Sequence, residues 1–238
     1  QEYLWVHTCP GDSTKINGVS GGQLIVAKSS VANISASLLG GNDTFQFGAQ
    51  GGASSNGYLH IFMGSGNDTV EIGAYSNIAG KLGISTSSGE DKVMLNVTTV
   101  GGATTINTSS SKDRIHVMGA TYLKGNLTID SGTGADEVFL EHSQVGGDTL
   151  IKTGDDSDVV CLSHMTFDKK IDVLLGSASG FLAFDVLDLH DSTFKGAFQA
   201  DGESDGDIYD SDNNIFQVSP VVLHFESYVD IDCDQLLS

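Results

Sequence analysis

The chain has 238 residues, 30 of them glycine and 2 proline, and a formal net charge of −20. Such a charge argues against nucleic acid and anionic membranes as partners, because both are bound through Lys and Arg that neutralise phosphate groups. No run of apolar residues is long enough to cross a membrane, so we expect no membrane insertion. Gln1 is not an initiator methionine, which predicts a processed chain or a piece of a longer one.

The chain begins with a segment, residues 1–22, that matches no repeat. Its residues Tyr3 to Val6 are predicted to form an edge strand or lid, because solenoids need atypical ends that cover the open stack. Residues 23–214 are predicted to form the coils, of which the first is irregular. Apolar alternation returns in residues 215–238, which we interpret as a C-terminal cap. The continuous repeat argues for a single domain.

An aspartate marks each coil, and we call these residues the lead aspartates. They are Asp43, Asp68, Asp91, Asp113, Asp136, Asp158, Asp185 and Asp207. Most are 22 or 23 residues apart, and the two longer steps contain the insertions 48–57 and 176–184. A fixed period in the twenties predicts a solenoid. The turns that precede them are rich in Gly, Ser and Asn, which tolerate left-handed backbone conformations.

Apolar residues alternate on both sides of these turns. Two and four residues after a lead aspartate stand Phe45/Phe47, Val70/Ile72, Val93/Leu95, Ile115/Val117, Val138/Leu140, Val160/Leu162 and Leu187/Leu189. A second set precedes the next lead aspartate: Leu59/Ile61, Leu82/Ile84, Thr104/Ile106, Leu127/Ile129, Thr149/Ile151 and Phe198/Ala200. A third inward position falls between them, at Ile78, Val100, Tyr122, Val145, Phe167 and Phe194.

Alternation over short runs is typical of half-buried strands and not of helices. Each coil therefore supplies two clear strands and one short strand. We predict an all-β fold, a three-sided parallel β-helix of about eight coils with 22–23 residues per coil and irregular terminal caps. We expect it to be right-handed, because parallel β crossovers strongly favour that hand.

The turn before several lead aspartates resembles the calcium-binding nonapeptide repeats of secreted toxins, whose motif is GGxGxDx followed by an apolar residue. The matching residues are Gly64, Gly66, Asp68 and Val70, and again Gly132, Gly134, Asp136 and Val138. The resemblance implies calcium ligands at Asp43, Asp68, Asp91, Asp136 and Asp158. This chain has one such turn per coil and a period of 22–23 in place of nine, so half of that family's cage is missing. The alternative is that each aspartate accepts backbone N–H groups within its own turn.

A second acidic segment resembles an EF-hand loop in the dockerin style. Its candidate calcium ligands are Asp201, Glu203, Asp205, Asp207 and Asp212. Glutamate is unusual at the third loop position, and neither flank reads as a helix. Because Asp207 also falls in the coil register, the alternative is a solvated acidic turn.

A third candidate site is a strip of histidines and aspartates on neighbouring coils. His142, His164 and Asp191 stand six residues after their lead aspartates, His190 stands beside Asp191, and Asp188 is close by. Since equivalent residues on stacked coils are about 5 Å apart, these side chains are expected to form an exposed row. Such a row suits a transition metal or general acid–base chemistry. The alternative is a set of solvent-facing turn residues with no site.

The three cysteines are expected to stay unbridged within the chain. Cys9 and Cys233 fall near opposite ends of the predicted stack, and Cys161 falls at an outward strand position. Bridged cysteines need Cα atoms within roughly 7 Å. A bridge would require a cap that folds back along the side of the helix.

The favoured function is non-catalytic: an extracellular structural or adhesion module of a secreted or cell-surface bacterial protein, with calcium as the cofactor considered. The location rests on the resemblance to other acidic repeat proteins rich in glycine and aspartate. The partner would be a cell-surface protein, a matrix protein or a glycan. End-to-end or side-to-side self-association stays open, since coil ends are unpaired strand edges.

The alternative is a carbohydrate-active enzyme, a polysaccharide lyase or hydrolase, or a carbohydrate-binding module that uses a side face. Pectate lyases and polygalacturonases are similar in being parallel β-helices. A lyase needs a cationic base, whereas this chain has 11 Lys and Arg in all, and its charge repels an anionic polysaccharide. These features weigh against catalysis.

Overall fold

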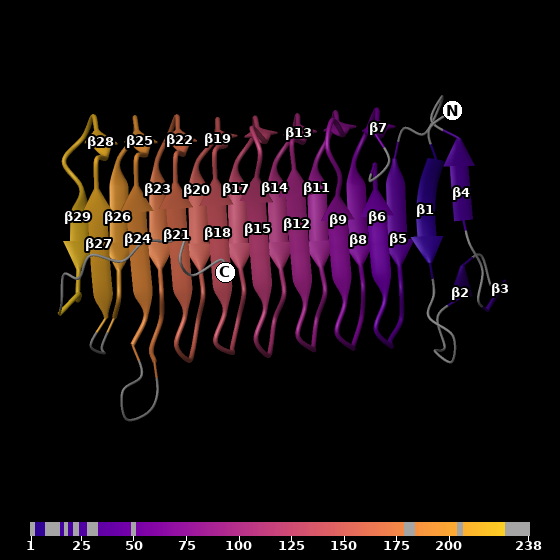
Figure 1. Cartoon of the computed structure of the whole chain (residues 1–238), viewed down its shortest axis with the longest axis horizontal. Helices are drawn as coiled ribbons and strands as arrows, with labels where there is room; N and C mark the ends of the chain where they lie inside the picture. Colours follow the sequence, from indigo (N-terminus) through magenta and orange to yellow (C-terminus); the bar gives the residue numbers. More distant parts are fainter. Residues whose placement is uncertain are drawn as a thin grey trace.

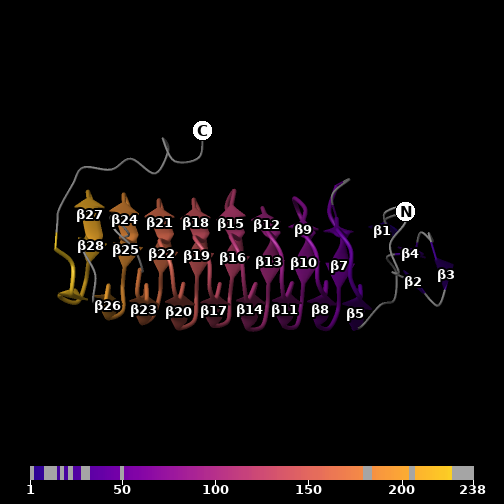
Figure 2. The same cartoon turned by 90° about the horizontal axis from the view of Figure 1, so that it is seen from below.

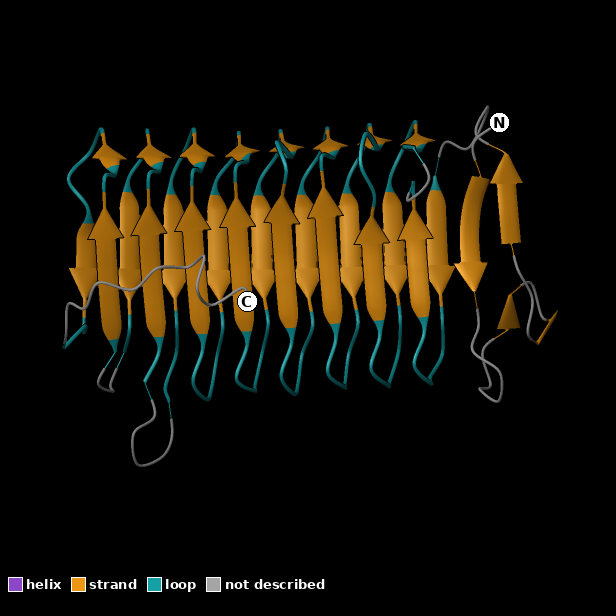
Figure 3. Cartoon of the chain, viewed as in Figure 1, coloured by secondary structure: helices purple, strands orange, loops and turns teal. Residues whose placement is uncertain are grey.

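The computed structural model describes residues 3–7, 15–16, 19–20, 24–27, 33–48, 51–178, 184–203 and 207–226. Every regular element in these ranges is a strand, and three long parallel sheets stack into a β-solenoid of about eight turns (Figures 1 and 3). The predicted all-β parallel β-helix is confirmed. No helix in the described ranges is long and apolar enough to cross a membrane.

The lead sheet contains the strands that follow the lead aspartates. Its parallel strands are β6 (Thr44–Phe47), β9 (Thr69–Ile72), β12 (Lys92–Asn96), β15 (Arg114–Met118), β18 (Glu137–Glu141), β21 (Val159–Ser163), β24 (Val186–His190) and β27 (Ile208–Asp212). Neighbours pair residue for residue, as Val93 does with Val70 and with Ile115. This in-register stacking puts equivalent side chains in columns along the axis.

The short sheet forms the second face. Its strands are β7 (Ser54–Ser55), β10 (Asn77–Ile78), β13 (Thr99–Val100), β16 (Tyr122–Leu123), β19 (Gln144–Val145), β22 (Thr166–Phe167), β25 (Thr193–Phe194) and β28 (Ile215–Phe216). A sharp corner joins each lead strand to its short strand. These corners carry the candidate site described below.

The return sheet closes each coil on the third face. Its strands are β5 (Ile34–Ser37), β8 (Leu59–Phe62), β11 (Leu82–Ser85), β14 (Thr104–Asn107), β17 (Leu127–Asp130), β20 (Thr149–Lys152), β23 (Ile171–Leu174), β26 (Phe198–Asp201) and β29 (Val221–Leu223). Figure 2 shows the three sheets as rows of strands along one axis.

The two ends of the stack differ from the predicted boundaries. β1 (Tyr3–His7) and β4 (Leu24–Ala27) extend the lead sheet beyond β6 by antiparallel pairing, and β2 (Lys15–Ile16) pairs with β3 (Val19–Ser20). The predicted strand at Tyr3 to Val6 is therefore present, but the parallel stack begins at Ile34 and not at residue 23. At the other end β28 and β29 pair in parallel with β25 and β26, so residues 215–223 continue the stack.

The core is a column of apolar side chains enclosed by the three sheets. The inward residues predicted in the lead and return strands are buried, for example Val138 and Ile129, which are both 0 % exposed. At the C-terminal end aromatic rings stack through the core, with Phe194 lying 5.4 Å from Phe167 and 4.7 Å from Phe216 between ring centroids. Burial of this column is the main force that holds the coils together.

The prediction that Tyr122 points into the core is wrong. The inward row of the short sheet runs Ile78, Val100, Leu123 and Val145 in register, and Leu123 is 1 % exposed. The coil that contains Tyr122 has one additional residue in the corner before β16, which shifts its register by one position. Because successive residues of a strand point to opposite faces, this shift turns Tyr122 outward.

Candidate functional site

The lead aspartates form a buried ladder along the stack. Oδ1 of every lead aspartate after Asp43 accepts the backbone N–H of the lead aspartate one coil earlier, at 2.7 or 2.8 Å, in a continuous series of bonds from Asp43 to Asp207. Every side chain of the series is at most 1 % exposed. Each carboxylate therefore joins two coils. The sequence interpretation, in which the aspartate accepts N–H groups of its own turn, identified the right kind of bond but the wrong donor.

Burial makes the charged form of these carboxyl groups costly. It raises the pKa of Asp68 and of Asp136 to about 6, of Asp113 to about 7 and of Asp158 to about 8. Desolvation is the largest cause in each case. Neighbouring ladder carboxylates add to it for Asp68, Asp113 and Asp158, whereas Asp156 and Glu137 do so for Asp136. These groups therefore take up protons in the folded protein at a pH where exposed aspartates are ionised.

The second oxygen, Oδ2, has no hydrogen-bond partner in several ladder residues. They are Asp68, Asp113, Asp136 and Asp158. The hydroxyls of Thr108 and Thr153 help to lower the pKa of Asp113 and Asp158, yet each donates its single hydrogen to a carbonyl oxygen, at 3.2 and 2.7 Å. A proton or a cation is therefore the species that would relieve the buried Oδ2 charge.

The five calcium-ligand candidates of the column are all members of this ladder. They are Asp43, Asp68, Asp91, Asp136 and Asp158. Within the described ranges, no group of three or more His, Cys, Asp or Glu residues is placed to hold a metal ion. Calcium at these positions stays a prediction, and the Discussion gives its test.

The acidic segment that resembles an EF-hand loop is divided between a turn and a strand. Asp201 accepts the N–H of Glu203 at 3.0 Å and lies 2.6 Å from Nδ1 of His224. Burial is the largest single influence on Asp201 and opposes its ionisation, but the hydrogen bonds from His224 and from the N–H of Glu203, together with the charge of His224, lower the pKa of this carboxyl. Asp207 belongs to the buried ladder, whereas Asp212 lies at the other end of β27. Asp205 lies outside the described residues.

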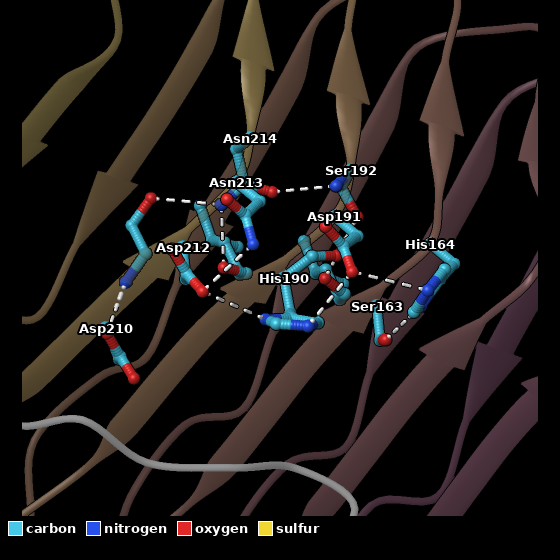
Figure 4. Close-up of polar contacts among 12 residues, drawn as sticks. Ser163, His164, His190, Asp191, Ser192, Asp210, Asp212, Asn213 and Asn214 are labelled. Atoms are coloured by element: carbon cyan, nitrogen blue, oxygen red, sulfur yellow. Dashed lines mark hydrogen bonds and ion pairs between the residues drawn. The ribbon is translucent and has the colours of Figure 1, made fainter.

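The predicted strip is present at the corners that follow the lead strands. The rings of His142 and His164 stack in parallel, with centroids 4.4 Å apart and planes 7° apart. Nε2 of His164 and of His190 lie 3.4 and 3.0 Å from the same oxygen, Oδ2 of Asp191 (Figure 4). Nδ1 of His190 lies 4.0 Å from Oδ2 of Asp212. Asp191 therefore bridges two histidines.

Asp188 does not share the strip. It stands in the middle of β24, in register with Cys161, and is 2 % exposed. His142, His164 and Asp191 instead occupy the corners, and His190 is the last residue of β24. A site on this edge of the molecule is therefore built from His142, His164, His190 and Asp191.

The backbone at these corners explains why the strip side chains form a row. His142, His164 and Asp191 have φ values of 48°, 52° and 46°, in the left-handed region that residues other than glycine seldom adopt. Tyr75 and Asn213 have φ of 66° and 54° at the corresponding corners of other coils. The repeated corner conformation places successive side chains one above the other. The sequence spacing reveals the row, but not the conformation that creates it.

A shallow groove of about 910 Å³ adjoins the first part of the strip. Its walls come from the corners of three successive coils, and the side chains that shape it are Met118, Tyr122, Glu141, His142, Gln144 and His164. Tyr122 takes part because of the one-residue shift described above. The sequence pattern assigned this residue to the core, so it could not reveal the groove.

Glu141 is the carboxylate within this groove. Its Oε2 lies 3.1 Å from Nε2 of His116, and its side chain is 14 % exposed. Oε1 is buried and has no hydrogen-bond partner. Beside it, Gln144 donates to Asp168 at 2.7 Å, and the Lys195 ammonium, 2.8 Å from Asp168, lowers the pKa of that carboxyl. One carboxylate oxygen of Glu141 therefore has no hydrogen-bond partner, whereas Asp168 is paired with the Lys195 ammonium.

The expectation of no disulfide within the chain is not met. Cys161 is disulfide-bonded, and it is fully buried beside Phe139 on the outer face of the lead sheet. The other cysteines, Cys9 and Cys233, lie outside the described residues.

No protein-family model, curated protein or solved structure matches this chain. The assignment of function below therefore rests on the residues and their geometry.

Proposed function

We propose that this protein is a non-catalytic extracellular module that presents the side faces of a rigid β-solenoid to a partner. The observation that supports it most is the ladder. Its carboxylates, the most regular row in the chain, accept hydrogen bonds that hold neighbouring coils together. A buried carboxylate that accepts a backbone N–H is unable to reach a substrate. The repeat therefore serves architecture, and the exposed corners are left for binding.

The disulfide supports an extracellular location. Structural disulfides persist in oxidising compartments and are rare in the cytosol, and Cys161 forms one within a buried apolar cluster. The acidic surface is consistent with this proposal, because a large net charge keeps a long β structure soluble.

The exposed carboxylates near the strip are held by partners, which favours binding over catalysis. Asp191 lies between His164 and His190, and Asp168 lies between Gln144 and Lys195. Glycoside hydrolysis needs two carboxyl groups that face one bond, one as acid and one as base or nucleophile. The groove contains a single carboxylate, Glu141, among its described lining residues.

The test combines a binding assay with an assay for catalysis. The labelled protein is applied to surfaces coated with collagen, fibronectin or mucin, and separately incubated with xylan and polygalacturonate. We expect saturable binding to at least one coated surface and no new reducing ends or unsaturated products. Product formation that disappears in His164→Asn would overturn the proposal in favour of an enzyme. Absence of binding to every surface would also overturn it.

A further inference from the structure

The outer face of the lead sheet is buried over three consecutive strands. Phe139 in β18, Cys161 in β21 and Asp188 in β24 stand in register at outward positions and are at most 2 % exposed. The equivalent residues of β12 and β15, Met94 and His116, are only partly buried. The described strands all belong to the stacked sheets or to the pair of β2 and β3, so none of them forms a second layer over this face. The burial therefore points to a covering segment outside these strands.

The disulfide of Cys161 restricts the choice of that segment. Its partner is Cys9 or Cys233, the two other cysteines of the chain. Cys9 comes two residues after His7, which ends β1, and β1 is six strands from β21 in the lead sheet. Strands are about 4.8 Å apart and two residues span at most about 7 Å, so Cys9 stays more than about 20 Å from Cys161. Bridged cysteines have Cα atoms within roughly 7 Å, which excludes Cys9.

Cys233 is within reach of Cys161. The N–H of Glu226 donates to the carbonyl oxygen of Asp207 at 3.0 Å, which places the chain beside the start of β27. Cys161 stands in register with Asp210, which is two strands away in β27 and three residues after Asp207. From these offsets the diagonal from Asp207 to Cys161 is about 14 Å. The seven residues from Glu226 to Cys233 span up to about 24 Å, which is enough to cross it.

The sequence of residues 227–238 suits this face of the sheet. From Val229 onward it reads VDIDCD, in which apolar residues alternate with aspartates. In an extended strand this period places Val229, Ile231 and Cys233 on one side and the aspartates on the other. The apolar side complements the buried cluster around Phe139 and the disulfide, whereas the aspartates can remain in water.

We propose that residues 227–238 form a strap that crosses the outer face of the lead sheet and is held there by a disulfide between Cys161 and Cys233. The strap covers Phe139 and keeps water from the centre of this face. Its aspartates are repelled by a chain of net charge −20, so the covalent bond is needed to hold it in place. The inference goes beyond the proposed function, because it closes the outer face of β18, β21 and β24 to a partner and leaves the corners of the strip open.

Peptide mapping of the unreduced protein tests the bridge. Trypsin places the three cysteines in the separate peptides 1–15, 153–169 and 196–238. The monomer band of a non-reducing gel is alkylated and digested, and mass spectrometry identifies the linked peptides. We expect 153–169 to be linked to 196–238 and Cys9 to be alkylated. A link between 153–169 and 1–15, or alkylation of Cys161, would overturn the proposal.

Hydroxyl-radical footprinting of the full chain tests the cover. Oxidation of Phe139 should be at least threefold faster in Cys233→Ser than in the original protein, because the strap is released. Phe194, 0 % exposed in the core, should stay protected in both proteins, and Tyr75, 77 % exposed, should react in both. The matched control is Cys9→Ser, which should leave Phe139 protected. Equal protection of Phe139 in Cys233→Ser and in the original protein would show that the strap is not the cover of this face.

Discussion

The backbone N–H of Asp113 donates a 2.8 Å hydrogen bond to Oδ1 of Asp136, and both side chains are 1 % exposed. This bond joins one coil to the next at the turn that precedes the lead strands. Its repetition along the stack turns a column of acidic residues into a structural element. The predictions that concern acid, calcium and ladder substitutions all follow from it.

The first prediction concerns Asp136 itself. Asp136→Ala removes the acceptor and leaves the Asp113 N–H buried and unpaired, which should lower the free energy of unfolding by about 1–3 kcal/mol. Asp136→Asn keeps an oxygen acceptor and removes a buried charge, so it should be neutral or stabilising at pH 7. Urea denaturation of the two variants measures the difference. If Asp136→Asn lowers the free energy of unfolding as much as Asp136→Ala does, the charge of Asp136 is required and the ladder is not a simple hydrogen-bond column.

The second prediction is that stability falls as pH rises from about 4 to 8. The folded-state pKa of Asp113 is about 7 and that of Asp158 about 8, above the ordinary value of 3.8. The folded protein therefore binds more protons than the unfolded chain in this range. Their contribution to stability is complete below the unfolded pKa and is lost as pH rises through the folded pKa.

The opposite contribution comes from groups with lowered pKa. They are Glu137, Asp168 and Asp201, whose stabilising effect is lost as pH falls through their folded pKa values. The free energy of unfolding should therefore be greatest in mild acid, near pH 4 to 5. Urea titrations across this range provide the measurement. A steady increase toward pH 8 would contradict the ladder's effect.

The third prediction distinguishes a proton from calcium at the ladder. Because Oδ1 of Asp136 accepts an N–H and the residue is buried, we expect millimolar calcium or EDTA to leave the midpoint of thermal unfolding unchanged at neutral pH. Circular dichroism follows the transition. A ligand that binds only the folded state must stabilise it, so a large upward shift with calcium would show that the folded protein binds this cation and would contradict the prediction.

The fourth prediction concerns the core. Ile129→Ala removes a fully buried side chain from β17 and should lower the free energy of unfolding by about 2–4 kcal/mol, through lost burial and the cavity left behind. Thr128→Ala, at the neighbouring outward position, is the matched control and should change it by less than about 0.5 kcal/mol. Chemical denaturation of both variants is the measurement. Equal losses would show that the two faces of β17 are not distinguished by burial.

The repeat period could be predicted from the sequence because every coil of a solenoid has the same local structure. The same residue types therefore recur at the same positions. An aspartate after a glycine-rich turn, followed by alternating apolar residues such as Val138 and Leu140, indicates a strand and shows which of its residues face the core. The spacing between such aspartates gives the coil length. The row of His142, His164 and Asp191 was readable for the same reason, since equal spacing from a lead aspartate means the same position on the coil. The local pattern was enough to predict the strands and their inward faces wherever the coil length stayed regular.

Features that depend on contacts between coils could be determined only from the tertiary structure. One additional corner residue turns Tyr122 from the core to the groove, because side chains alternate between the two faces of a strand. The donor to Asp136 lies 23 residues away, and the spacing of the cysteines did not predict the disulfide bond of Cys161. The sequence alone thus determined the period and the buried face. Only three-dimensional packing could determine the hydrogen-bond partners, the orientation at irregular corners and the groove, because each depends on residues of several coils.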